Sequence, residues 1–376
     1  MITCKDVSSS HFLGGAAALI ATIVVANAQL SLPTPLPETP EAFGTVLNAW
    51  AAKYHVDRAL VVVRRDGKIV YQSTLGGANA SAPVHLASLS KAITGACVAT
   101  LIRDGKLAFE TPLSRILGKF FAAHGKPSDP RVADVTVAQL LTHRAGFSGN
   151  ADNNHVDAVR ELVAYLKQNS ARQPPKPQLL ITAFKRPLAH QPGSDFVYSN
   201  TGYLALGAVI EEAAGKPYLS YCREAVLTPL GITGDFEPDW QVMGAYGAWR
   251  MAGEAYLQML DLFAPDDQRL GPEVKTWMLS PEGKTVSSDR QVWYGLGTHV
   301  RKAGAGVNLW HWGAWRFNLA GAKDGTLRSS FVTFAVRENG GTSWFVHATP
   351  RVEEGPARLE LDRGLFSAFR AVRRWN

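Results

Sequence analysis

Hydrophobic and polar positions along the chain change from a strand pattern to a helical pattern and back. Residues 59–65 (ALVVVRR) and 68–74 (KIVYQST) are rich in β-branched residues, and Asp66-Gly67 between them is a dipeptide that tight hairpin turns favour. Apolar residues then recur at helical spacing through the middle of the chain. After residue 288, short β-rich runs return between glycine-rich or Asn-Gly turns. Strands are therefore expected at both ends and helices between them.

This order of elements predicts an α+β fold, in which both chain ends build one antiparallel sheet flanked by helices and carry an inserted all-helical domain. The sheet unit is expected to comprise residues 42–87 and 288–376, and the helical unit residues 88–287, with a ligand cleft between them. Helices are expected over residues 91–103, 137–142, 156–167, 202–214, 254–263 and 357–374. Strands of the second sheet segment are expected over residues 292–300, 307–312, 330–337 and 343–348.

The first 28 residues have the pattern of a secretory signal. An apolar run from Phe12 to Val25 leads to the small-residue sequence Ala26-Asn27-Ala28, although Lys5 in the polar start is offset by Asp6. The run is shorter than the roughly 20 apolar residues that a spanning helix needs. Cleavage near Ala28 is therefore expected, followed by a proline-rich tether over residues 29–41 and no stable membrane span. A periplasmic or secreted location follows from this expectation.

Composition narrows the possible partners and the role of the cysteines. With 46% hydrophobic residues in a chain of 376, a sizeable core is expected. The net charge is +7, but the chain has no dense Lys/Arg tract, so no nucleic-acid partner is expected. The sequence leaves the oligomeric state open. Cys97 and Cys222 lie in apolar helical stretches, so buried free thiols are expected, with a single disulfide as the alternative.

Ser88 and Lys91 lie between the first strand region and the first strong helix. If Ser88 opens that helix, Lys91 three residues later projects from the same face, within reach of the hydroxyl. A serine becomes a nucleophile when a base takes its proton, and a buried lysine can be that base because desolvation disfavours the ammonium. A capping serine followed by an exposed lysine is the alternative for this pair taken alone.

Two later elements carry groups that suit the same chemistry. In Tyr198-Ser199-Asn200, the phenol can exchange a proton once a nearby cation lowers its pKa, and the amide can bond a lysine and a substrate carbonyl. In His311-Trp312-Gly313, the glycine would let the backbone approach a substrate, and the N–H of Ala314 would be an oxyanion donor. Helix capping by Asn200 and plain sheet packing by His311 are the alternatives.

With these elements in this order, the chain resembles the serine β-lactamase and penicillin-binding superfamily, most closely its class C β-lactamase-like branch of esterases, D-aminopeptidases and carboxypeptidases. Ser-x-x-Lys, Tyr-x-Asn and His-x-Gly each occur once in the chain. Similar segments within residues 42–349 are HLASLSKAITGACVATLIRDGKL, VTVAQLLTHRAGF and PGSDFVYSNTGYLALGAVIEEAAGKPY. The resemblance implies a β-lactamase/transpeptidase-like fold and no cofactor; the sequence shows no plausible metal-ligand spacing.

The resemblance also implies the roles of the residues that handle the proton. Ser88 would be acylated, and Lys91 and Tyr198 would share the proton transfers. The choice of main base between Lys91 and Tyr198 stays open. Asn200 would orient Lys91 and the substrate.

The remaining roles concern the substrate. The N–H groups of Ser88 and Ala314 would form the oxyanion hole, and Gly313 and His311 would also line the substrate site. His143, in LLTHRAGF, is expected to be structural.

One departure from the family pattern bears on the substrate. Many β-lactamases and carboxypeptidases have a lysine where His311 stands, and a mostly neutral imidazole holds a substrate carboxylate less well. Arg316 is a candidate for the missing cation, and residues 235–250 match the family weakly. We therefore expect a secreted serine hydrolase that cleaves ester or small amide or peptide bonds. The alternatives are a β-lactamase or D,D-carboxypeptidase that acts on β-lactams or peptidoglycan peptides, and a non-catalytic ligand-sensing protein.

Overall fold

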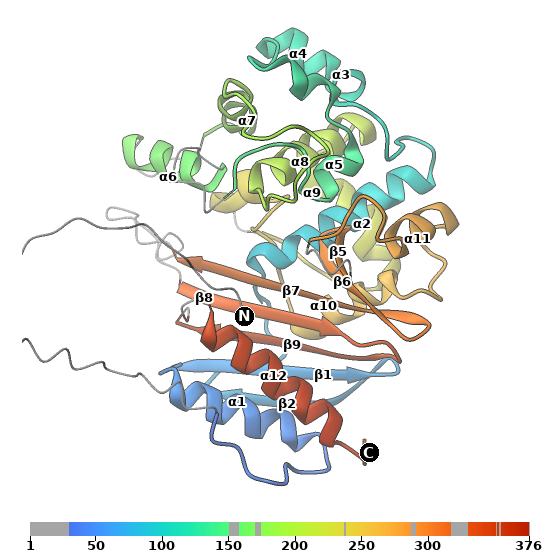
Figure 1. Ribbon diagram of the computed structural model, residues 1–376. Coiled ribbons are helices and arrows are strands. Elements are labelled where there is room, and N and C mark those ends of the chain that lie inside the picture. Colours follow the sequence, from blue (N-terminus) through green and yellow to red (C-terminus); the bar gives the residue numbers. More distant parts are fainter. Residues whose placement is uncertain are drawn as a thin grey trace, which may run out of the picture.

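One seven-stranded antiparallel sheet organises the molecule, with strand order β2-β1-β9-β8-β7-β6-β5 (Figure 1). The computed structural model describes residues 30–149, 158–169, 174–236, 238–286, 291–316, 330–350, 352 and 355–375. The strands are β1 (Arg58–Arg65), β2 (Lys68–Leu75), β5 (Val292–Gly295), β6 (Thr298–Ala303), β7 (Gly306–Arg316), β8 (Ser330–Arg337) and β9 (Thr342–Thr349). Because β1 pairs with β9, both ends of the chain build the sheet, and the predicted fold class is confirmed.

Helices α1 (Glu41–Lys53) and α12 (Pro356–Ala371) pack together and cover one face of this sheet (Figure 1). Their apolar residues form a core with the inward side chains of β1, β8 and β9, among them Trp50 and Trp344. The indole N–H of Trp50 donates a hydrogen bond of 2.8 Å to the carbonyl of Ala357 and so joins the two helices. This face of the sheet is closed by packing.

The other face carries the helices that lie between β2 and β5 in the chain (Figure 1). Helix α2 (Ser90–Arg103) is buried from Ser90 to Ile102, which explains its apolar sequence on all sides. The remaining helices are α3 (Leu113–Ile116), α4 (Gly118–His124), α5 (Val137–Leu141), α6 (Ala158–Gln168), α7 (Lys176–Phe184), α8 (Asn200–Ala214), α9 (Tyr218–Cys222), α10 (Gly253–Leu260) and α11 (Pro272–Leu279). A short ribbon of β3 (Val84–His85) and β4 (Arg250–Met251) completes the fold.

The expectation of one strand over residues 292–300 is wrong, since this segment is a hairpin. Leu296 and Gly297 form its turn, and both have positive φ angles, 50° and 83°. A leucine seldom adopts that conformation, so the pattern of the sequence did not indicate a turn. Gly297 is required by packing, because a Cβ there would lie 2.2 Å from the carbonyl carbon of Lys91. The hairpin turn therefore rests directly on α2.

Cys97 and Cys222 form a disulfide, and the expectation of free thiols is wrong. Their Cα atoms lie 5.4 Å apart, although 125 residues separate them in sequence. Hydroxyl pairs bring α2 and α9 side by side: Thr94 Oγ1 lies 2.7 Å from Tyr218 Oη, and Thr100 Oγ1 lies 2.9 Å from Tyr221 Oη. The sequence spacing carries no sign of this contact, because it depends on the packing of the two helices.

Within the described ranges, no helix is both long and apolar enough to cross a membrane. The expected signal, residues 1–28, lies outside them.

Candidate active site

Ser88 lies in a tight turn that leads into α2. The turn is the 3-10 helix η1 (Ala87–Leu89), and Ala87 has a φ angle of 47°, in the left-handed region that side chains disfavour. Leu86 anchors the turn: its N–H donates to the carbonyl of Trp249 (2.8 Å), and its carbonyl accepts from Thr333 Oγ1 (2.8 Å). Ser88 is only half-buried between the buried residues Ala87 and Leu89. The turn thus exposes one side chain, the expected nucleophile.

Lys91 lies fully buried with its amine beside that hydroxyl. Nζ is 3.2 Å from Ser88 Oγ, 2.7 Å from Asn200 Oδ1 and 3.0 Å from the carbonyl oxygen of Tyr246. The amide and carbonyl oxygens can only accept, so a neutral amine gives both of its N–H bonds to them. Its lone pair is then available to a hydroxyl proton. The geometry therefore suits Lys91 as a base towards Ser88.

Three tyrosine rings surround the amine of Lys91. Their centroids lie 4.9 Å (Tyr198), 5.5 Å (Tyr203) and 5.8 Å (Tyr246) from Nζ. Rings at this distance exclude water and interact with the ammonium when it forms. The rings therefore form an aromatic enclosure around the amine beside Ser88.

The segment that carries Tyr198 and Asn200 is fixed by His143. The N–H of Ser199 donates to His143 Nδ1 (3.2 Å), and the imidazole lies against the ring of Tyr198 with 4.3 Å between centroids. Burial, and then the charge of Lys91, hold the pKa of His143 well below its ordinary value. The imidazole is therefore neutral. His143 thus supports the segment that carries Tyr198 and Asn200.

The edge of β7 closes the site opposite α2. Strand β6 pairs with β7 only as far as Trp310, and beyond that point η1 lies against β7. A Cβ on Gly313 would lie 2.5 Å from the carbonyl oxygen of Leu86 and 3.0 Å from the nitrogen of Ser88. Only glycine allows this approach. The backbone at Gly313 and Ala314 therefore passes beside the N–H of Ser88.

His311 lies beneath this edge, and the protein engages both of its ring nitrogens. Nδ1 is 2.6 Å from the carbonyl oxygen of Trp312, and Nε2 is 2.9 Å from the hydroxyl of Tyr294. The side chain is 4% exposed, and burial, followed by the charges of His299 and Lys91, lowers its pKa well below the ordinary value. His311 is thus uncharged and does not act as a cation beside Ser88.

The structure brings together Ser88, Lys91, Tyr198, Asn200, His311 and Gly313. Arg316 is exposed at the end of β7, where the described chain is interrupted. Two partners escaped the sequence analysis. Tyr246 contributes a backbone carbonyl, which any residue type would supply, and Tyr294 stands next to the turn that the sequence did not reveal. Among the described residues, no group of three or more His, Cys, Asp or Glu side chains suits a metal ion.

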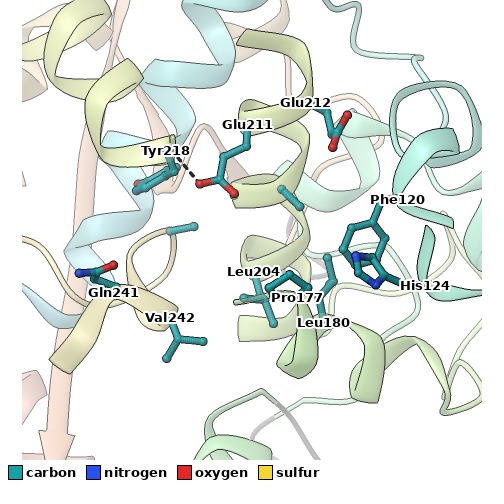
Figure 2. A pocket seen from close by; sticks show the side chains of 13 residues that line it. Phe120, His124, Pro177, Leu180, Leu204, Glu211, Glu212, Tyr218, Gln241 and Val242 are labelled. Atoms are coloured by element: carbon teal, nitrogen blue, oxygen red, sulfur yellow. Dashed lines mark hydrogen bonds between the residues drawn. The ribbon is translucent and has the colours of Figure 1, made fainter. Parts of the chain in front are cut away.

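A separate cavity of about 230 Å³ lies among α4, α7, α8 and the loop before Tyr246 (Figure 2). Its wall is mainly apolar, from residues such as Leu180 and Leu204, and Glu211 accepts a hydrogen bond of 2.9 Å from the backbone N–H of Tyr218 beside it. Neither Ser88 nor Lys91 lines this cavity. It takes no part in the catalytic arrangement.

Comparisons with known proteins identify the family of this chain. The family model described as "Beta-lactamase" matches residues 43–322. Esterase EstB of Burkholderia gladioli is 31% identical over 182 residues, which are 46% of this chain and 45% of the esterase. A putative D-alanyl-D-alanine carboxypeptidase of Escherichia coli O157:H7 is 27% identical over 191 residues, 46% of this chain and 41% of that protein. The match thus spans less than half the length of these relatives.

A solved structure shows the same fold over most of the chain. The D-stereospecific amidohydrolase from Streptomyces sp. superposes with a TM-score of 0.67 at 18% identity, covering 86% of this chain and 98% of that one. At such low identity the likeness concerns the fold alone.

Proposed function

Since this chain belongs to the β-lactamase family, we propose that it is a serine hydrolase that cleaves ester or small amide or peptide bonds through an acyl-enzyme on Ser88. The observation that carries the proposal is the position of the Lys91 amine, 3.2 Å from Ser88 Oγ and held by two acceptors. Matches to an esterase and to a putative carboxypeptidase support an acyl-transfer reaction of this kind.

In the first step, Ser88 Oγ attacks the carbonyl carbon of the substrate while its proton moves to Lys91 or, through it, to Tyr198. The carbonyl oxygen becomes an oxyanion, for which the N–H groups of Ser88 and Ala314 are the proposed donors. Collapse of this intermediate breaks the bond to the leaving alcohol or amine. The leaving group takes the proton back from the Lys91–Tyr198 pair, and the acyl group stays on Ser88.

In the second step, water attacks the acyl-enzyme. The same pair removes a proton from the water and returns it to Ser88 Oγ as the acid departs. Asn200 orients Lys91 in both steps, because its Oδ1 accepts a hydrogen bond of 2.7 Å from the Lys91 amine. The four side chains therefore serve both half-reactions without a cofactor step.

The state of His311 bears on the substrate class. A carboxylate on the substrate would find a neutral imidazole whose nitrogens are both bonded within the protein. Burying a neutral polar group without a hydrogen-bond partner costs on the order of 2–7 kcal/mol, and burying a carboxylate without a cation costs more. Substrates that lack a carboxylate near the scissile bond are therefore favoured over penicillins and C-terminal peptides.

We also propose export of the protein, with cleavage near Ala28. Two features support an oxidising compartment: the signal-like sequence of residues 1–28, and the disulfide between Cys97 and Cys222.

A substrate panel tests the proposed class. We expect short-chain p-nitrophenyl esters to be hydrolysed with a higher kcat/KM than a chromogenic cephalosporin, with D-amino-acid amides between or below them. Ser88→Ala serves as the blank for every substrate. The reverse ranking, with the cephalosporin fastest, would identify a β-lactamase instead and refute the substrate class while leaving acylation at Ser88 in place.

A further inference from the structure

We infer that Tyr294 is a positioning residue for catalysis. It acts through His311 on the edge of β7 that carries the N–H of Ala314, which we call the oxyanion edge. The inference rests on the proposed function, since it concerns the donor that Ala314 offers to the substrate. Tyr294 comes from β5, two strands away from β7, and reaches His311 along the face of the sheet that also carries His299. Its hydroxyl lies 2.9 Å from His311 Nε2.

The chemistry of the partners determines where the protons lie. The carbonyl oxygen of Trp312 can only accept, so the proton of the neutral imidazole is on His311 Nδ1, 2.6 Å away. Nε2 therefore presents a lone pair, and the hydroxyl of Tyr294 donates to it. Burial raises the pKa of Tyr294 well above its ordinary value, so the phenol keeps the proton that it donates. The chain of donors thus runs in one direction, from Tyr294 through His311 to Trp312.

This series of hydrogen bonds ends at the carbonyl oxygen of Trp312, on the oxyanion edge of β7. Successive residues of a strand direct their N–H and C=O groups to opposite edges, so Trp312 and Ala314 face the same edge. Strand β6 stops pairing at Trp310, which leaves that edge of β7 to η1 and Ser88. Fixing the carbonyl of Trp312 therefore fixes the direction of the Ala314 N–H, two residues further on.

Packing holds the imidazole for this task. The rings of His299 and His311 stack with 5.5 Å between centroids, and His299 also stacks on Trp310 at 5.3 Å. The ring of Tyr198 lies 6.0 Å from that of His311. Stacking fixes the plane of the imidazole but leaves its two flipped orientations and its tautomers open. The hydroxyl of Tyr294 selects one of them.

The test is Tyr294→Phe, which removes the hydroxyl that donates to His311 and that also bonds to Tyr203. We expect kcat for a p-nitrophenyl ester to fall about 10- to 100-fold, with KM changed less than about twofold, because one misdirected oxyanion donor weakens the transition state alone. Nitrogen-15 NMR of imidazole-labelled protein should show His311 as the Nδ1–H tautomer in the wild type and a mixture in the variant. The matched control is Tyr221→Phe, which also removes a buried phenol hydroxyl but lies on α9 away from Ser88, and should keep kcat and the His311 signals unchanged.

A double-variant comparison completes the test. If Tyr294 acts through His311, adding Tyr294→Phe to His311→Ala should slow the reaction no further. Additive losses, an unchanged kcat in Tyr294→Phe, or a rise in KM alone would overturn the inference. Should Tyr294→Phe fail to fold, an Nε2–H tautomer of His311 in the wild type would overturn it just as directly, and an Nδ1–H tautomer together with non-additivity of Tyr294→Leu would support it. Failure of the proposed function is a separate result, seen as a wild type that no acylating probe modifies at Ser88.

Discussion

At the scale of residues, the site depends on close approaches that leave no space for a further atom. Gly313 is the clearest case, because its missing side chain leaves room for the hydrogen bond from Thr333 Oγ1 to the carbonyl of Leu86 beside it. The amine of Lys91 is similarly enclosed by three rings and two acceptors. Substitutions at these positions are therefore expected to displace neighbouring atoms even where they change no charge.

We predict that Gly313→Ala impairs both activity and stability. The added methyl would lie 2.5 Å from the carbonyl oxygen of Leu86 and 3.0 Å from the nitrogen of Ser88, which pushes the turn away from β7. Overpacking of this kind costs about 1–3 kcal/mol, and we expect kcat/KM to fall at least about 10-fold. Ester kinetics and urea unfolding measure the two effects.

Gly118→Ala is the matched control, since a Cβ at Gly118 in α4 meets no atom within 4 Å. That variant should keep full activity and unfold no more easily than the wild type. Full activity in Gly313→Ala would show that β7 does not closely approach the turn.

The sequence identified the polar side chains of the site better than their supports. Ser88, Lys91, Tyr198 and Asn200 could be predicted because each contributes a side chain with distinctive chemistry. The carbonyl of Tyr246 could not, since every residue carries one. The hydrogen bonds of His311 also escaped the sequence analysis, because Tyr294 lies in the β5–β6 hairpin that the sequence pattern did not reveal.

At the scale of elements, α2 is the helix that positions the residues of the site. It begins two residues after Ser88, carries Lys91, and is buried by α8, α9, α11 and the β5–β6 turn. Its disulfide to α9 fixes the helix about two turns after Lys91. The helix is thus held by the β5–β6 turn near its start and by a covalent bond near its middle.

We predict that the Cys97→Ala/Cys222→Ala variant is less stable than the oxidised wild type. Removing a native disulfide typically costs about 2–5 kcal/mol, and the loop closed here spans 125 residues. Urea unfolding with and without reductant measures the loss of stability. Reductant should destabilise the wild type to the same extent and should leave the variant unchanged. Two free thiols in the native purified protein, detected by alkylation and mass, would contradict the bond.

Local patterns predicted elements well where the turn chemistry is ordinary. Asp66-Gly67 indicated the hairpin of β1 and β2, and the apolar periodicity indicated α2, α8 and α12. The β5–β6 hairpin was missed because Leu296 occupies a left-handed position that packing against α2 imposes. Helix α1 was also missed, since its burial depends on α12 from the other end of the chain.

At the scale of the whole molecule, many buried imidazoles make stability depend on pH. Burial lowers the pKa of His85 and His299 to about 4 and that of His347 to about 3. The folded state therefore binds fewer protons than the unfolded state, whose histidines titrate near 6.5. This part of the stability is complete above about pH 6.5 and is lost as the pH falls towards the folded values. Glu338 acts in the opposite direction, because burial, followed by the charge of Asp362, raises its pKa to about 7.

We predict that the several histidines outweigh the two carboxyl groups whose pKa burial raises, Glu338 and Asp362, so the urea midpoint should fall steadily from pH 7 to pH 5. His347→Phe should reduce the slope of this decline, because it removes one of the groups that the folded state keeps neutral. His124→Gln, at an exposed position on α4, should leave the slope unchanged. A midpoint that rises on acidification would contradict the account.

Covalent labelling at Ser88 tests the central claim most directly. Intact wild-type protein treated with a fluorophosphonate should gain the mass of one adduct, and digestion should place it on the peptide that contains Ser88. Ser88→Ala should gain none while keeping the wild-type unfolding midpoint, and Lys91→Met should react about 10²- to 10⁴-fold more slowly because the base is gone. A folded wild type that acquires no adduct, or an adduct that persists in Ser88→Ala, would contradict the assignment of Ser88 as the nucleophile.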